Sequence, residues 1–352
     1  MIERDDLRAA VGSGLLSEKQ AAGLIALSDS RRGARENLAP GDEPFELFKG
    51  FNEIFIVIGL IILSFGWSGV VTLALGDEIV DLKRYAMIVA GAGAIMLWLL
   101  SEYFIRRRRM VAPAIALSVM FAGNAAFGFL ATMTHPFMIA QNDFSSVPLP
   151  LLLATLALVV YWWRFRVPFA MAMIAVGLFI IAIVFTASRG GEVEDISDLF
   201  LLSAGGPFAW ITLVLGMLAF AVAMIFDMSD PHRVTRRSAN GFWLHVVAAP
   251  ALINTIALSL MENDSFGILV WVLVFFALVA IIIDRRSFLI TAIGYVVAIS
   301  ATVFDGDGAA LTILILGVAL LILGALWEQI RATILHLLGP ALPLQKLPPA
   351  HD

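Results

Sequence analysis

IFIVIGLIILSFGWSGVVTLAL, residues 54–75, is an uninterrupted apolar run of 22 residues without a charged side chain. A helix of this length crosses the hydrocarbon core of a bilayer, which is about 30 Å thick. In lipid, only helices and closed barrels satisfy their backbone hydrogen bonds, and this run lacks the two-residue alternation of a barrel strand. The sequence therefore predicts a transmembrane helix.

Nine further apolar runs follow the first one. They are residues 85–105, 111–134, 147–163, 169–187, 207–226, 242–261, 266–283, 288–304 and 309–327. Among the 23 basic and 28 acidic residues of the chain, only Glu102 lies inside a run. We therefore predict an all-α, polytopic transmembrane helix bundle of about ten spans over residues 53–327.

The composition agrees with this fold class. Apolar residues make up 60% and charged residues 14% of the 352 positions, whereas soluble domains average about 45–50% and about 25%. A soluble enzyme is excluded, because the polar residues are too few to cover its surface. The chain has no cysteine, which also excludes disulfides, thiolate metal ligands and cysteine nucleophiles.

The loop charges predict how the bundle is oriented. With ten spans and an inner N-terminus, 20 of the 23 basic residues lie on the inner side, and only Lys83, Arg84 and Arg189 lie outside. The positive-inside rule then predicts that both termini are cytoplasmic. The outer loops hold 12 acidic residues and a net charge of −9. These acids either concentrate cations at an outer mouth or are simply tolerated there.

A short polar segment precedes the bundle. Residues 1–39 predict a cytoplasmic helical hairpin, whose second helix begins at Ser17 with Gln20 in the spacing of a capping box. Because so short a hairpin buries little surface, we expect it to dock on the bundle, a second copy of the chain or a protein partner. Residues 40–52 contain two prolines and predict a linker.

Residues 328–352 follow the last predicted span. Their first part, EQIRATILHLL, is amphipathic, with Glu328 and Arg331 set against Ile330, Ile334, Leu335 and Leu338. We expect this helix to lie flat on the cytoplasmic surface, with Arg331 on its polar side, and to be followed by a mobile tail. Two longer outer loops, residues 135–146 and 188–206, either carry re-entrant pieces or simply cap the bundle.

Several polar residues occur at membrane depth, where they are costly unless they face other helices or a cavity. As candidates for a substrate path between the first, third, seventh and ninth spans we identify Ser64, Ser68, Thr72, Asn124, Asn254, Thr255, Thr291 and Tyr295. The alternative is that these groups form hydrogen bonds between packed helices.

The approach to the seventh span combines charged residues with a histidine. Asp227, Asp230 and Arg233 precede it, and His245 lies about one turn inside its expected start. Imidazole titrates near neutral pH, so these four residues are candidates for a cytoplasmic gate. Alternatively, His245 reaches toward the headgroups and the aspartates pair with arginines. We also expect Pro250 to break this helix.

Motifs for nucleotide binding, zinc proteases and serine hydrolases are absent from the sequence. We therefore predict no metal, no cofactor and no nucleic-acid partner. A lipid-modifying enzyme using Asp227, Asp230, His232 and His245 remains a third hypothesis, although these spacings match no known mechanism.

Five segments resemble a set of proteobacterial multi-pass membrane proteins of unestablished function. They are GLLSEKQA at 14–21, GFNEIFIVIGLIIL at 50–63, DPHRVTRRSANGFWLHVVAAP at 230–250, DRRSFLITAIGYV at 284–296 and LPPA at 347–350. The resemblance covers most of the chain. It implies a protein of the bacterial inner membrane and carries over no catalytic residues.

Two functions follow from these patterns. The first is a permease or channel for a small solute without a deep carboxylate relay, because the spans offer hydroxyl and amide groups but only Glu102 as an acid. The second is a non-transporting scaffold or sensor. It would dock a partner through residues 1–39 and bind anionic lipid at its basic inner loops.

Overall fold

The computed structural model describes residues 4–31, 51–75, 82–141, 143–190, 196–202, 206–285, 314, 317–318, 321–339 and 343–349. Within these ranges the chain is helical and contains no strand. The main helices are α1 (Arg4–Gly12), α2 (Glu18–Arg31), α3 (Phe51–Leu75), α4 (Leu82–Ser101), η2 (Glu102–Arg107), α5 (Ala112–Met133), α6 (Pro148–Phe165), α7 (Phe169–Ala187), α8 (Phe208–Met228), α9 (Arg236–Glu262), α10 (Phe266–Ile283) and α13 (Trp327–Leu338).

Eight of these helical stretches are long and apolar enough to cross a membrane. They coincide with the first eight predicted spans and confirm a polytopic helical membrane protein. The ninth predicted span, residues 288–304, lies outside the described residues, as does most of the tenth. The count of ten spans and the inner position of both termini therefore stay predictions.

Large apolar side chains on the spans point outward, as expected where lipid is the solvent. Phe65 is 76% exposed, Leu73 86% and Trp271 75%. Soluble monomers rarely expose contiguous apolar surface on this scale.

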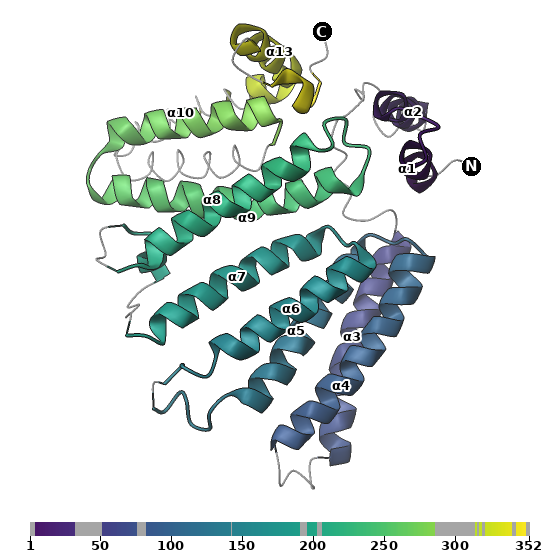
Figure 1. Ribbon diagram of the computed structural model, residues 1–352, viewed down its shortest axis with the longest axis vertical. Helices are drawn as coiled ribbons and strands as arrows, with labels where there is room; N and C mark the ends of the chain where they lie inside the picture. Colours follow the sequence, from purple (N-terminus) through teal and green to yellow (C-terminus); the bar gives the residue numbers. More distant parts are fainter. Residues whose placement is uncertain are drawn as a thin grey trace. The chain divides into compact units, whose positions relative to one another are not determined.

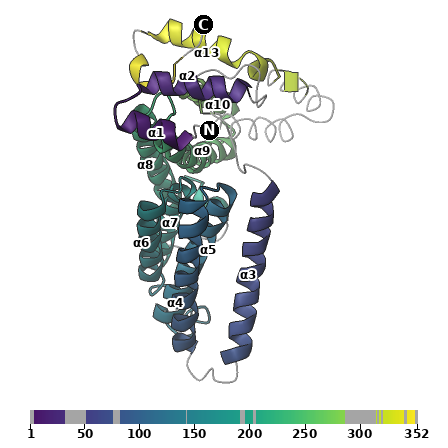
Figure 2. The same cartoon turned by 90° about the vertical axis from the view of Figure 1, so that its right-hand side faces the viewer.

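The helices belong to two compact units. The α3–α7 unit comprises Pro44–Asp195 and Gly206–Ile211, and the α8–α13 unit comprises Met1–Glu43, Ile196–Gly205 and Thr212–Asp352. In the first unit α4 and α5 lie side by side, and α6 and α7 follow in chain order (Figures 1 and 2).

The core of the α3–α7 unit is aromatic. Tyr161 of α6 stacks on Phe121 of α5 with ring centroids 4.6 Å apart, and Trp98 of α4 meets Phe165 edge to face at 5.0 Å. The buried Tyr161 hydroxyl lies 2.8 Å from Ser101 Oγ, so its polar end has a partner. This cluster joins α4, α5 and α6.

Small residues bring α4 and α5 close together. Asn124 Nδ2 donates to the Ala90 carbonyl at 2.8 Å, and a Cβ on Gly93 would lie 2.5 Å from Asn124 Oδ1. A Cβ on Gly128 would lie 2.6 Å from the Ala90 methyl group. Close contacts of this kind are typical of membrane helices, whose association depends on packing and interhelical hydrogen bonds.

Glu53 fixes the start of α5 from the neighbouring helix α3. The carboxylate is buried and accepts the backbone N–H groups of Val111, at 3.3 Å, and Ala112, at 2.9 Å. The first N–H groups of a helix lack partners within the helix, so this acid acts as a cap supplied by a remote segment.

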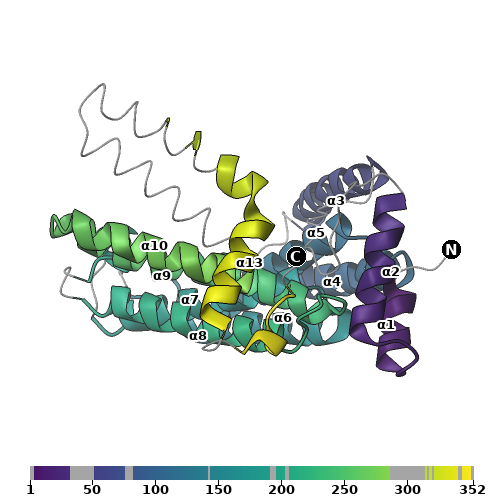
Figure 3. The same ribbon diagram turned by 90° about the horizontal axis from the view of Figure 1, so that it is seen from above.

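In the α8–α13 unit, α9 is the central helix. In the apolar stretch of this helix, 56% of the residues are buried. Helix α9 packs against α10 through Ile253, Ala257, Leu269 and Leu273. The C-terminal helix α13 contacts α10 (Figure 3).

Helix α9 differs from the prediction in two ways. It begins at Arg236, six residues before the expected start, because the Thr235 side chain caps it by accepting the N–H of Arg237. The expected break at Pro250 is wrong, since the helix continues through this residue to Glu262. Helix packing in membranes tolerates the backbone group that a proline leaves without a partner.

The N-terminal hairpin has the helices that the sequence predicts (Figure 3). Its capping box is formed: Gln20 N donates to Ser17 Oγ at 3.3 Å, and Ser17 N donates to Gln20 Oε1 at 3.0 Å. The hairpin packs on the segment before α9, where Ala21 and Ala22 bury Val234. Arg8 Nε also donates to the Val234 carbonyl at 2.9 Å.

The C-terminal helix corrects the expectation for Arg331. This residue is 4% exposed and lies on the buried side of α13 with Trp327 and Leu335, not on its polar side. Its guanidinium is satisfied by backbone carbonyls, including that of Pro348. Residues 343–349 of the predicted mobile tail are therefore attached to α13 in the structure.

The two loops that are predicted to lie outside, residues 135–146 and 188–206, are only partly described. Residues 135–141 and 143–146 form turns, closed by a hydrogen bond from His135 N to Ser146 Oγ at 3.0 Å. Of the second loop, Leu202 N donates to Ser259 Oγ of α9 at 2.9 Å.

Candidate functional site

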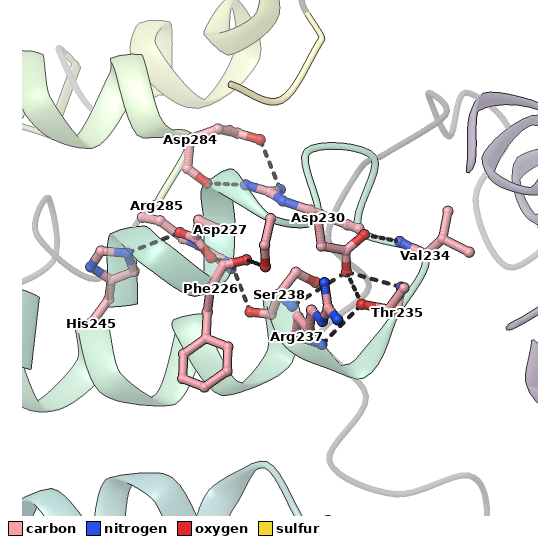
Figure 4. A network of polar contacts seen from close by, with 12 residues as sticks. Phe226, Asp227, Asp230, Val234, Thr235, Arg237, Ser238, His245, Asp284 and Arg285 are labelled. Atoms are coloured by element: carbon pink, nitrogen blue, oxygen red, sulfur yellow. Dashed lines mark hydrogen bonds and ion pairs between the residues drawn. The ribbon is translucent and has the colours of Figure 1, made fainter. Parts of the chain in front are cut away.

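A buried charge network lies where α8 ends, α9 begins and α10 ends (Figure 4). Asp227 belongs to the last turn of α8, His245 to α9, and Arg285 follows α10. Arg285 donates from Nη2 to Asp227 Oδ1 at 2.6 Å and from Nε to Oδ2 at 3.0 Å. His245 Nε2 lies 2.9 Å from Oδ2 and donates there, because an ionised carboxylate only accepts. One carboxylate thus binds two basic groups.

All three side chains are shielded from solvent. His245 is 0% exposed, Arg285 1% and Asp227 7%. The Phe220 ring meets the His245 ring edge on at 5.4 Å, and the Phe242 ring lies 5.9 Å from the Arg285 guanidinium carbon. The alternative that His245 reaches toward the headgroups is therefore wrong.

Gly241 allows α8 and α9 to approach each other here. A Cβ at this position would overlap Asp227 Oδ1 and would lie 3.1 Å from the Ala223 carbonyl oxygen. The absence of a side chain at Gly241 thus makes room for the Asp227 carboxylate. Nearby, Arg285 Nη2 also donates to the Ser238 carbonyl at 2.8 Å.

Asp230 shapes the segment that joins α8 to α9. Its carboxylate accepts the N–H groups of Val234, at 3.1 Å, and Thr235, at 2.9 Å, and the Thr235 hydroxyl at 2.7 Å. It also lies 3.4 Å from Ser238 N in the first turn of α9, where a negative charge complements the helix dipole. Burial raises the pKa of the Asp230 carboxyl above its ordinary value, while the hydrogen bonds from Thr235, Ser238 and Val234 act in the opposite direction.

Asp284 forms a second pair at the end of α10. It adopts the left-handed conformation, with φ of 55°, directly after the helix. Arg233 forms an ion pair with its carboxylate at 2.8 Å and donates to its carbonyl at 2.7 Å. Trp327 Nε1 of α13 donates to the same carboxylate at 2.8 Å. Asp284 therefore joins α10 to the α8–α9 segment and to α13.

Arg331 completes the set from α13. It donates to the Ile281 carbonyl at 3.1 Å and to the Pro349 carbonyl at 3.0 Å. Burial lowers the pKa of the Arg331 guanidinium, while the nearby Asp284 charge raises it. A cation at the last carbonyls of α10 is favourable because these carbonyls form the negative end of the helix dipole.

The network contains as many guanidinium groups as carboxylates. They are the carboxylates of Asp227, Asp230 and Asp284 and the guanidinium groups of Arg233, Arg285 and Arg331. With His245 neutral, the six charges sum to zero, so a proton on His245 would add one positive charge to a buried site. Chemically, the arrangement can bind helix ends together and can respond to protonation.

The structure brings the four gate candidates into this network. His245, Asp227, Asp230 and Arg233 all belong to it. Asp227 pairs with an arginine, but with Arg285 and not with one of the arginines of its own segment. Asp230 binds backbone N–H groups and the Thr235 hydroxyl instead. Outside this site, Glu102 pairs with Arg106, four positions later in the chain, at 3.1 Å and also with Arg164 at 2.6 Å.

The substrate-path candidates that the structure describes lie outside this network and are divided between the two units. Ser64, Ser68, Thr72 and Asn124 belong to the α3–α7 unit, whereas Asn254 and Thr255 belong to the α8–α13 unit. The hydroxyls of Ser68, Thr72 and Thr255 each donate to a carbonyl four residues earlier in their own helix. Thr72 Oγ1 also lies 3.2 Å from the Tyr85 hydroxyl. Thr291 and Tyr295 lie outside the described residues.

Sequence reasoning missed Arg285, Asp284 and Arg331 as members of the site. Asp284 and Arg285 directly follow a span and match an ordinary inner loop, and Arg331 matches the polar side of an amphipathic helix. One signal for the site was present in the sequence: an acid, Asp227, and a base, Arg285, each lie next to the end of a predicted span. Their separation of 58 residues hid the pairing.

The fold thus defines an integral, multi-pass membrane protein with a buried ionic site at its helix ends. The chain matches no protein-family model, no curated protein and no solved structure. The described residues include no group of three histidine, aspartate or glutamate side chains arranged to hold a metal ion.

Proposed function

We propose that this membrane protein is a non-transporting scaffold or sensor that presents its N-terminal hairpin to a protein partner. The observation that carries the proposal is the docking of the hairpin on Val234. Val234 lies in the segment between α8 and α9, and its backbone N–H donates to the carboxylate of Asp230, a member of the buried network. The hairpin is thereby coupled to the state of that site.

The described docking contacts are individually weak. They include a side-chain hydrogen bond from Arg8 and a cluster in which Ala21, Ala22 and Val234 are the buried members. A neutral or singly charged hydrogen bond contributes only about 0.5–3 kcal/mol net, and alanine buries little apolar surface. Leu15 remains 79% exposed and Leu24 43% exposed, which leaves apolar surface on the hairpin for a partner.

The contacts of the polar intramembrane residues support the scaffold over the permease. The Thr72, Thr255 and Asn124 side chains donate to backbone carbonyls of the helices, as packing groups do. The buried charges gather at helix ends, where they join segments. A permease needs polar groups that are available to a solute.

The absence of cysteine makes the proposal directly testable. In the full chain, Ala22→Cys combined with Val234→Cys gives one disulfide pair that can lock the hairpin, since both side chains belong to the same buried cluster. The partner that reduced protein captures from native membranes should be lost on oxidation. Each single-cysteine variant, oxidised in the same way, serves as the matched control and should retain it.

Two results would overturn the proposal. One is an identical set of captured proteins for the locked hairpin, the free hairpin and a chain lacking residues 1–39. The other is solute flux: purified protein in proteoliposomes should move neither ions nor small metabolites above the rate of empty vesicles. Flux that depends on Asn124 or Asn254 would establish the permease instead.

A further inference from the structure

Six arginines gather at one end of the α3–α7 unit, away from the network described above. They are Arg106 and Arg107 in the last turn of η2, Arg108 and Arg109 directly after it, Arg164 near the end of α6 and Arg166 directly after α6. The only acid in these two segments is Glu102. The cluster therefore has a formal charge of +5.

Glu102 brings the two segments together. Its carboxylate binds Arg164 at 2.6 Å through one oxygen and Arg106 at 3.1 Å through the other. One acid thus links the four-arginine run to the end of α6, and the two segments together hold six arginines and one acid.

Aromatic rings support the guanidinium groups. The Arg108 guanidinium carbon lies 5.6 Å from the Tyr103 ring centroid, and its Nε donates to the Tyr103 hydroxyl at 3.2 Å. The Arg166 guanidinium carbon lies 5.0 Å from the Trp162 ring centroid. Such contacts reduce the freedom of a long side chain before a ligand binds.

The backbone of the cluster is also unusual. Residues Glu102–Arg107 form a π-helical turn, a feature frequent at functional sites. Arg109 and Arg166 both adopt the left-handed conformation, with φ of 53° and 54°. This conformation is unfavourable for residues with a Cβ, and it clusters at binding sites.

We infer that this arginine cluster binds the phosphate group of anionic phospholipids. Arginine matches phosphate oxygens with two parallel N–H donors, and the excess of positive charge selects anionic over zwitterionic headgroups. Trp163 is 66% exposed and Tyr103 40% exposed beside the arginines, as residues at the level of the headgroups are. These exposed aromatic residues at the ends of two spans favour a lipid over a soluble phosphate compound.

The test measures lipid retention by the full chain. Purified protein in detergent is titrated with phosphatidylglycerol or phosphatidylcholine, and bound lipid is counted by native mass spectrometry. Arg106→Gln combined with Arg107→Gln should weaken phosphatidylglycerol binding about 25-fold, at about fivefold for each arginine. Lys83→Gln combined with Arg84→Gln removes the same charge from the other end of α4 and should leave binding unchanged.

The remaining measurements separate the possible outcomes. Glycerol 3-phosphate, which has the headgroup phosphate without acyl chains, should not compete; competition would show a soluble anion site and overturn the lipid assignment. Equal retention by the two double variants would overturn the site itself, as would equal binding of phosphatidylcholine. Should the Arg106 and Arg107 double variant not fold, Arg107→Gln alone decides, with an expected fivefold loss.

Discussion

Arg285→Met should destabilise the α8–α13 unit strongly. The substitution keeps a long apolar side chain but removes the guanidinium that is 1% exposed and binds Asp227 through two hydrogen bonds. Among the described side chains, Asp227 would then be a buried carboxylate with His245 as its remaining hydrogen-bond partner. The Ser238 carbonyl would also lose the hydrogen bond from Arg285.

The expected size follows from these contacts. Removing one partner of a buried ion pair costs about 3–5 kcal/mol, because the remaining charge stays desolvated. Two hydrogen bonds to a charged group, at about 1.5–3 kcal/mol each, give a similar figure. Arg285→Met should therefore lower the free energy of unfolding by about 3–5 kcal/mol.

Neutralising the partner should restore much of this loss. In the double variant Asp227→Asn with Arg285→Met, no buried carboxylate remains, and the amide oxygen can still accept from His245. Replacement of a buried ion pair by uncharged groups often changes the free energy of unfolding very little. The double variant should thus be more stable than Arg285→Met by about 2 kcal/mol or more, which is a coupling typical of residues in contact.

The measurement is unfolding by denaturing detergent, followed by tryptophan fluorescence. The matched control is Arg106→Met, because Arg106 is 51% exposed and its pairing with Glu102 contributes at most about 1 kcal/mol. A wild-type unfolding midpoint for Arg285→Met would refute the reasoning, as would a double variant no more stable than the single one.

Three further substitutions test individual contacts. Gly241→Ala should lower the free energy of unfolding in detergent by about 1–3 kcal/mol, since its Cβ would overlap Asp227. Gly66→Ala in α3, whose Cβ would meet open space, should raise it by about 0.5–1 kcal/mol. Equal effects of the two substitutions would contradict the close approach of α8 and α9 at Gly241. Ser17→Ala should cost about 0.5–2 kcal/mol of hairpin stability in hydrogen exchange, and unchanged exchange would refute a stabilising cap. Because burial raises the pKa of Asp230, the folded state binds a proton more readily than the unfolded chain. Its contribution to stability is full below the unfolded pKa and falls as the pH rises through the folded one, so Asp230→Asn should flatten the pH dependence of unfolding above about pH 4.

The membrane fold could be predicted from the sequence because its signals are local. Each span is a continuous apolar run, so eight of them coincide with helices of the structure. The Ser17 capping box and the pairing of Glu102 with Arg106 involve residues three and four positions apart. Such contacts follow from helix geometry alone.

The network could be predicted only in part, because its pairs are distant in the sequence. Asp227 and His245 stood out as polar residues beside a span, but Arg285 lies 58 positions from its partner. Arg331 was misassigned because periodicity places a charged residue on the polar side of a helix. Its burial depends on carbonyls of α10 and of the segment after α13, which no local pattern shows.

The members of the network share a relation to helix ends, which explains why so many charges are buried together. Asp230 lies at the positive start of α9, and Arg331 binds carbonyls at the negative end of α10. Asp230 and Arg331 thus replace water at backbone groups that a helix leaves without internal partners. Such a site joins α8, α9, α10 and α13 through contacts of Asp227, Asp284 and Arg331. Because the Val234 N–H also binds Asp230, the surface on which the N-terminal hairpin rests depends on the same carboxylate that binds Ser238 N in the first turn of α9.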